Sequence, residues 1–181
     1  MGAFIKEHDP EHLITTGLEG FTRSGSASGW KHDGSQGTDF IRNHRPASID
    51  FATFHLWPAQ WRMAQVESLR WVEEHILSAH AVLKKPVVLE EFGWSRDARG
   101  STATRDGFYR AVLDTVCAAG GSGALFWAHY HEGYPDYDGY GVYPGKDRST
   151  AQIITRAARR MRRARCAVSA TTSRPGREGR R

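Results

Sequence analysis

The stretch Lys85–Ser95, KPVVLEEFGWS, joins an apolar run to two adjacent carboxylates, an aromatic residue and a glycine. A β-branched apolar run of this length indicates a buried strand of a parallel sheet. Successive side chains of a strand point to opposite faces, so we expect only one of Glu90 and Glu91 to share the side of Leu89. Gly93 favours a sharp turn after the strand. The stretch therefore predicts an acid at the carboxyl end of a strand, where catalytic groups of α/β barrels lie.

This acid also has a purely structural interpretation. A carboxylate at the end of a strand can cap the next loop, or it can pair with a nearby cation, here Arg96. The stretch alone leaves both interpretations open.

Apolar segments alternate with amphipathic ones along the rest of the chain. A helix that ends near Glu7 comes first, and a long polar loop spans 22–48. Strands are predicted over residues 12–16, 49–55, 87–91 and 123–129, and helices over 69–83, 108–119 and from a cap at Ser149 or Thr150 onward. The alternation predicts parallel βα units, and hence an α/β fold.

The charge of the chain is unevenly distributed. Residues 156–181 hold ten Arg and one acid, which leaves 15 basic and 19 acidic side chains in the rest of the chain. An acidic body argues against a nucleic-acid-binding domain. We expect a folded unit over 1–158, and over 159–181 a disordered, basic, low-complexity tail. Cys117 and Cys166 are too few for a disulfide framework, and the N-terminus shows no signal peptide and no membrane span.

Four residues that we place at the ends of strands lie 36 positions apart: Glu19, His55, Glu91 and Trp127. This spacing is expected if successive units each deliver one group to the same edge of the sheet. A histidine beside a carboxylate can act as a base, a metal ligand or an orienting donor, and a tryptophan offers a flat face to a sugar ring. His75 and His80 lack the spacing of a zinc helix, and no phosphate-binding loop occurs. We therefore expect no metal and no cofactor.

Four segments, taken in order, resemble the second half of family 5 glycoside hydrolases, and within that family the endo-β-1,4-mannanases in particular. They are IKEHDPEHLITTGLEGF at 5–21, GTDFIRNHRPASIDFATFHLWPAQW at 37–61, KPVVLEEFGWSRD at 85–97 and GALFW at 123–127. The resemblance covers residues 1 to about 158. It implies a (β/α)8 TIM barrel that hydrolyses internal β-1,4 linkages of mannan with retention, and of that barrel only strands 5–8 and their helices.

The resemblance also implies roles for individual residues. Glu91 becomes the nucleophile that attacks the anomeric carbon, and His55 the histidine near the reacting sugar. Trp127 matches a sugar-stacking tryptophan, while Trp57 stands where most members have a tyrosine that hydrogen-bonds the nucleophile. Glu19 lies in a matching segment as a candidate substrate-binding residue, with a loop salt bridge as its alternative. Glu90 is assigned a supporting or structural role.

The family places its acid/base glutamate in an Asn-Glu-Pro motif, and this sequence contains no such motif. We therefore expect the nucleophile half of an active site, inactive alone, whose open barrel edges permit self-association. The family also implies a polysaccharide partner and an extracellular location. Two alternatives stay open: a β-1,4-glucanase of the same family, or a non-catalytic carbohydrate-binding remnant. Specific nucleic-acid binding and membrane association are not expected.

Overall fold

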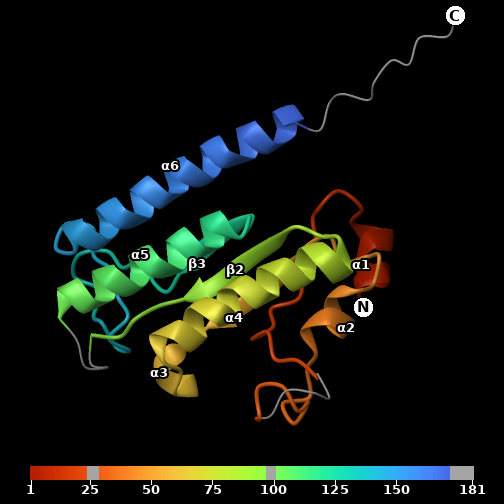
Figure 1. The fold of residues 1–181 in the computed structure, drawn as a ribbon, viewed down its shortest axis with the longest axis horizontal. Helices are drawn as coiled ribbons and strands as arrows, with labels where there is room; N and C mark the ends of the chain where they lie inside the picture. The colour runs from red at the N-terminus through yellow and green to blue at the C-terminus, as the bar shows by residue number, and fades with distance from the viewer. Residues whose placement is uncertain (24–28, 97–100, 172–181) are drawn as a thin grey trace, which may run out of the picture.

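The computed structural model describes residues 1–23, 29–96 and 101–171 (Figure 1). The elements in chain order are helices α1 (Gly2–His8) and α2 (Phe40–His44), strand β1 (Ala52–Leu56), helices α3 (Pro58–Trp61) and α4 (Gln65–Ser78), the π-helical turn η1 (Ala79–Leu83), strand β2 (Val87–Phe92), helix α5 (Thr102–Ala118), strand β3 (Gly123–Phe126) and helix α6 (Arg148–Thr171). The predicted alternation of strands and helices is confirmed from β1 onward.

The three strands form one parallel sheet in the order β1-β2-β3. In the pairing of β1 with β2, Phe54 lies opposite Leu89, but the next residue, His55, lies opposite Glu91. The ladder therefore skips Glu90. A skipped residue of this kind is a β-bulge, which changes the direction of the side chains that follow it.

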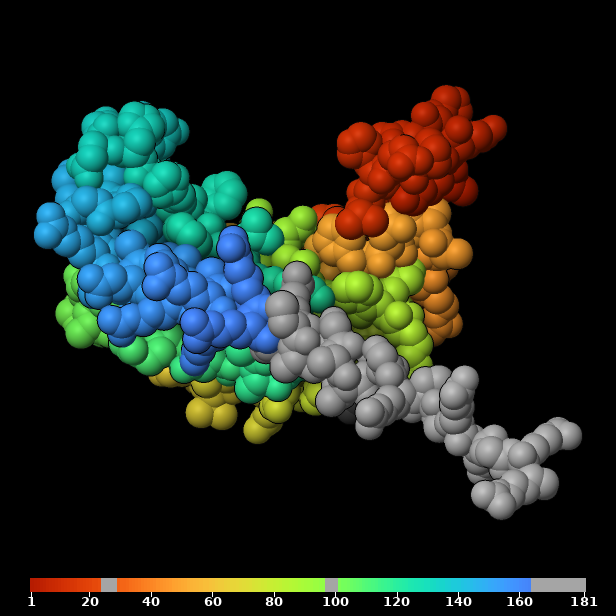
Figure 2. All heavy atoms as spheres, turned by 90° about the horizontal axis from the view of Figure 1, so that it is seen from above, coloured from red at the N-terminus to blue at the C-terminus, as the bar shows by residue number. Residues whose placement is uncertain are grey.

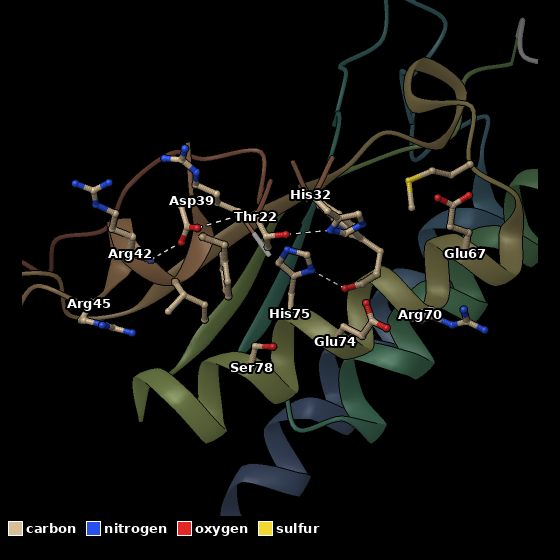
Figure 3. A pocket seen from close by; sticks show the side chains of 15 residues that line it. Thr22, His32, Asp39, Arg42, Arg45, Glu67, Arg70, Glu74, His75 and Ser78 are labelled. Carbon is tan, nitrogen blue, oxygen red and sulfur yellow. Dashed lines mark hydrogen bonds between the residues drawn. The ribbon is translucent and has the colours of Figure 1, made fainter. Parts of the chain in front are cut away.

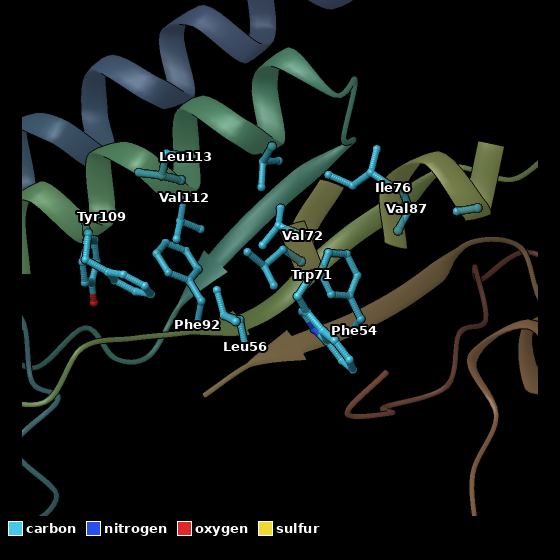
Figure 4. Packing of buried hydrophobic residues seen from close by; sticks show 14 of the residues in the cluster. Phe54, Leu56, Trp71, Val72, Ile76, Val87, Phe92, Tyr109, Val112 and Leu113 are labelled. Atoms are coloured by element: carbon cyan, nitrogen blue, oxygen red, sulfur yellow. The ribbon is translucent and has the colours of Figure 1, made fainter. Parts of the chain in front are cut away.

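The core lies between the sheet and the helices α4 and α5, which cover one of its faces (Figures 1 and 4). The strands contribute Phe54, Leu56, Val87, Leu89 and Phe92, and the helices contribute Trp71, Val72, Ile76, Tyr109, Val112 and Leu113. Helix α6 packs outside α5 (Figure 1). Leu125 of β3 is 54% exposed, so the opposite face is open at this strand.

The predicted strand over residues 12–16 is wrong. This segment lies beside the residues that lead into β1, and the amide of Asp50 donates to the carbonyl of Ile14 over 2.8 Å. The amide of Thr53, however, donates over 3.1 Å to Nε2 of His44, and the Thr53 hydroxyl donates to the carbonyl of Thr16. Side chains thus replace the backbone bonds that would make this segment a ladder strand.

Helix α6 differs from its prediction at both ends. It begins at Arg148, so Ser149 and Thr150 lie inside it, and the Thr150 hydroxyl donates to Asp106 Oδ1. It continues to Thr171, so residues 159–171 are helical where we expected a disordered tail. Residues 172–181 of that tail lie outside the described residues. The loop predicted over 22–48 also contains a helix, α2, whose N-cap Asp39 accepts from the amide of Arg42.

Gly20 is a position where the fold requires the absence of a side chain. Its φ is +103°, and an added Cβ would lie 2.9 Å from Phe54 Cβ and 3.0 Å from His75 Nε2. We expect Gly20→Ala to lower the free energy of unfolding by about 2 kcal/mol or more, through strain and overpacking. Urea unfolding followed by circular dichroism measures this.

Gly17 provides the matched control, because an added Cβ there meets nothing within 4 Å. Gly17→Ala should change the urea midpoint little. A Gly20→Ala midpoint equal to that of Gly17→Ala would contradict the close packing of this segment on β1.

Candidate active site

The side chain of His55 lies among three carboxylates. Its Nδ1 is 3.4 Å from Glu19 Oε2 and 3.5 Å from Glu91 Oε2, and its Nε2 is 3.4 Å from Glu90 Oε2. The bulge explains why Glu90 and Glu91, which are adjacent in sequence, both reach the imidazole ring of His55. The expectation that Glu90 and Glu91 point to opposite faces is therefore wrong, and Glu90 belongs to this cluster.

The backbone around His55 is fixed from two sides. Its amide donates to the carbonyl of Glu19 over 3.1 Å, which ties the end of β1 to the segment before it. Its carbonyl accepts from Nε1 of Trp71 on α4 over 2.9 Å. These bonds explain how Glu19, predicted to lie at the same edge from its spacing of 36 residues, comes to lie beside the imidazole of His55.

The three acids change the electrostatics of His55. Burial lowers the pKa of this histidine, but the contact with Glu19 and the negative charges of Glu91 and Glu90 outweigh burial and raise its pKa above the usual value. A protonated ring can donate from both nitrogens, one toward Glu90 and one toward Glu19 and Glu91. The raised pKa thus favours the positively charged imidazolium form of His55.

Aromatic side chains form a wall beside this cluster. Trp57, which follows β1, meets the rings of Trp127 and Tyr140 edge to face, with centroid distances of 6.3 and 5.2 Å. Tyr140 donates from its hydroxyl to Gln60 Oε1 over 3.0 Å. Trp127 is 42% exposed, so part of its ring remains available to a ligand. An exposed indole can stack on the apolar face of a sugar.

Gly93, at the end of β2, allows this wall to lie close to the strand of Glu91. An added Cβ would lie 2.6 Å from Tyr140 Cδ1 and 2.7 Å from the carbonyl oxygen of Trp127. Gly93 has no positive φ and no turn forms at it, so the sharp turn that we predicted there is wrong. The structure requires glycine at this position because the loop that follows β3 approaches it closely.

Arg96 does not pair with Glu91, which was the structural alternative for the acid. Its Nη2 donates to Asp147 Oδ2 over 2.6 Å, and its Nε is 3.4 Å from Asp136. Asp147 also accepts from the buried Arg105 over 2.6 Å. These ion pairs connect the loop after β2 to the loop after β3.

A cavity of about 1090 Å³ lies away from this site (Figure 3). Residues of α2 and α4 line it with the segment around Thr22 and His32, and none of the predicted site residues does. Among the residues that the structure describes, no group of three or more His, Cys, Asp or Glu side chains is placed to hold a metal ion. Within the same ranges, no helix has the length and apolar character needed to cross a membrane.

The arrangement of an acid at a strand end, a histidine beside it and an aromatic wall can be compared with known proteins. The family model described as GH family 5 beta-mannosidase-like matches residues 1–138. The chain belongs to glycoside hydrolase family 5. The recognition of this family from four segments of sequence is thereby confirmed.

Curated relatives and solved structures point the same way. A mannan endo-1,4-beta-mannosidase from Oryza sativa subsp. japonica is 38% identical over 179 residues, which cover 90% of this chain and 41% of that protein. An endo-1,4-beta-mannanase from Rhizomucor miehei superposes with a TM-score of 0.78 at 30% identity, over 90% of this chain and 44% of its own. A mannanase from Thermotoga petrophila gives 0.75 at 31% identity, over 87% and 49%.

These neighbours are TIM barrels, and this structure is a partial α/β fragment of that fold with a parallel sheet. The chain spans less than half the length of the curated relatives it matches.

Sequence reasoning missed several residues of the wall. Tyr140, Gln60 and Asp138 lie near Trp57 and Trp127, and none was a candidate. Tyr140 and Asp138 come from a loop rich in Gly, Tyr and Asp, where composition alone does not identify which side chain faces the site. Gln60 lies in the short helix α3, which follows directly on β1 and Trp57.

The raised pKa of His55 can be measured. In an NMR titration, we expect its ring to titrate above pH 6.5, and Glu91→Gln to lower its pKa because a neighbouring negative charge is lost. His55 then stabilises the fold below pH 6.5, and this contribution is lost as the pH rises through the raised pKa.

Glu73, exposed on α4, supplies the control for this titration. Glu73→Gln removes the same charge away from the site and should leave the His55 pKa unchanged. A pKa of His55 at or below 6.5 in the unmodified chain would contradict the three-carboxylate environment.

Proposed function

We propose that this chain carries the nucleophile half of a mannan-degrading active site. Glu91 attacks the anomeric carbon of a β-1,4-linked mannosyl residue and forms a covalent glycosyl ester, which water then hydrolyses with retention. We assign residues 1–181 the nucleophile and not the acid/base carboxyl, because they contain no Asn-Glu-Pro motif. The observation that carries the proposal is the position of Glu91, which lies at the end of a parallel strand, 3.5 Å from His55 Nδ1 and near an exposed tryptophan.

His55 and the wall have separate tasks in this proposal. The ring of His55 lies 3.5 Å from Glu91 Oε2 and fixes the position of the carboxylate that attacks the sugar. Trp127, and Trp57 behind it, provide the apolar surface on which the sugar lies. Glu19 and Glu90 each lie 3.4 Å from one ring nitrogen of His55, and we assign them to positioning the histidine.

The relatives' names favour mannan over the β-1,4-glucan alternative, since the matched proteins are mannan endo-1,4-beta-mannosidases. We also propose that the protein meets its polysaccharide outside the cell, where members of its family act. The binding-only alternative rests on the exposure of Trp127 alone, because a stacking platform needs no nucleophile beside it. In that case, mannohexaose binding would survive Glu91→Gln and be lost in Trp127→Ala.

Covalent trapping tests the role of Glu91 without the missing acid. A 2-deoxy-2-fluoro-β-mannobioside with a 2,4-dinitrophenolate leaving group needs no protonation when its glycosidic C–O bond breaks. We expect Glu91 Oε to displace the dinitrophenolate, so that the mass of the protein rises by one fluoromannobiosyl group. Peptide mapping should place this group on Glu91.

Glu90→Gln and Glu91→Gln form a matched pair of variants for this experiment, since each removes one carboxylate charge beside His55. Labelling should persist in Glu90→Gln and disappear in Glu91→Gln. A label on Glu90 would overturn the assignment of Glu91 as the nucleophile. A chain that binds mannohexaose but takes no label would overturn the catalytic proposal in favour of binding alone.

We further propose that the open edges of the sheet associate with a second copy of the chain. Leu125 on β3 and Leu13 beside β1 are 54% and 73% exposed, and apolar groups on unpaired edges favour association. Figure 2 shows a hollow in the surface between the N-terminal residues, drawn in red, and the residues of the loop after β3, drawn in teal.

Sedimentation velocity over a range of concentrations tests the association. We expect dimers that Leu125→Lys weakens, because a charge on the edge of β3 has to be buried in the dimer. Leu77→Lys, at a position of α4 that is 52% exposed, is the control and should leave the dimers intact. Monomers at every concentration would contradict the proposal.

A further inference from the structure

The indole of Trp127 is bound by a carboxylate from the loop that follows β3. Its Nε1–H donates to Asp138 Oδ2 over 2.9 Å. Trp57 meets the same indole edge to face at 6.3 Å, with an interplanar angle of 77°. A tryptophan side chain turns about two torsions, and a contact at one edge does not fix both. The bond to Asp138 adds the second point of attachment.

Asp138 is itself held in place independently of Trp127. Its Oδ1 accepts from the amide of Tyr140 over 2.9 Å and from the hydroxyl of Tyr130 over 3.3 Å. The adjacent residue Gly139 accepts from the amide of Arg96 over 2.8 Å, which attaches the loop to the end of β2. The orientation of the Asp138 carboxylate therefore does not depend on its bond to the indole of Trp127.

Asp138 is also ionised near neutral pH. Partial burial raises its pKa, but the hydrogen bonds from Trp127, from the Tyr140 amide and from Tyr130 outweigh burial and lower its pKa below the usual value. Hydrogen bonds to an ionised acceptor are stronger than those between neutral groups. The contact to the indole is thus of the stronger kind.

We propose that Asp138 is a positioning residue for Trp127, which fixes the plane of the indole and so sets the affinity of this surface for mannan oligosaccharides. Stacking requires the ring to lie parallel to the face of the sugar. A ring that is already oriented does not lose rotational freedom when the sugar binds, and binding is tighter for that reason. The choice of ligand rests on the proposed function, whereas the orientation of the ring does not.

A double-mutant cycle with mannohexaose as the probe tests the proposal by titration calorimetry. We expect Asp138→Asn to weaken binding about tenfold, because a charged acceptor is lost from the indole. Trp127→Phe keeps an aromatic face and removes the N–H. In the Trp127→Phe background, Asp138→Asn should therefore have no further effect. A tenfold loss that persists in that background would overturn the proposal, since Asp138 would then act through the loop alone.

A second measurement needs no sugar. In a ¹⁵N spectrum of the indole groups, Trp127→Phe identifies the Nε1–H signal of Trp127, and Asp138→Asn should shift that signal. Tyr130→Phe, which removes another donor to the same carboxylate, is the matched control and should leave the Trp127 signal near its place. An unshifted signal in Asp138→Asn overturns the proposal.

The two measurements together separate this inference from the proposed function. Suppose that mannohexaose fails to bind the unmodified chain while Asp138→Asn shifts the indole signal. The proposed ligand and the proposed effect of Asp138 on its affinity are then both wrong. The conclusion that Asp138 orients the ring of Trp127 is still supported.

Discussion

The structure depends most on the bulge in the pairing of β1 with β2. Because the ladder passes from the pair Phe54 and Leu89 directly to His55 and Glu91, Glu90 is left without a partner strand position. Both glutamates then reach one imidazole, with Glu19 as a third acid from the preceding segment. Three neighbouring carboxylates repel one another, and the positive charge of the imidazolium offsets this repulsion.

Much of the fold could be predicted from the sequence. The apolar runs of β1, β2 and β3 and the stripes of α4 and α5 are regular, and their order indicates parallel βα units. The spacing of 36 residues also predicted correctly that Glu19, His55 and Glu91 lie at one edge of the sheet. These predictions succeeded because they rest on periodicity and on topology, both of which are properties of the chain itself.

The failures share a different cause. Residues 12–16 have the composition of a strand. However, Nε2 of His44 accepts from the amide of Thr53, which would donate to a neighbouring strand in a ladder. The alternation of Glu90 and Glu91 failed because a bulge depends on the partner strand. Asp138 was missed because its bond to Trp127 closes within a loop without regular pattern. Each of these contacts is tertiary, so no local signal in the sequence announces it.

Gly93 has a consequence for how this site diverges among related chains. The ring of Tyr140 and the carbonyl of Trp127 occupy the space where any side chain at this position would begin. The floor of the site is therefore closed to variation, since every substitution there displaces the backbone on which the aromatic wall stands. Side chains of the loop after β3 that do not meet Gly93 are under no such constraint, because that loop is also held to the body through Arg96 and Asp147. We therefore expect a change of ligand preference to be reached through substitutions in that loop, with the reacting strand unchanged.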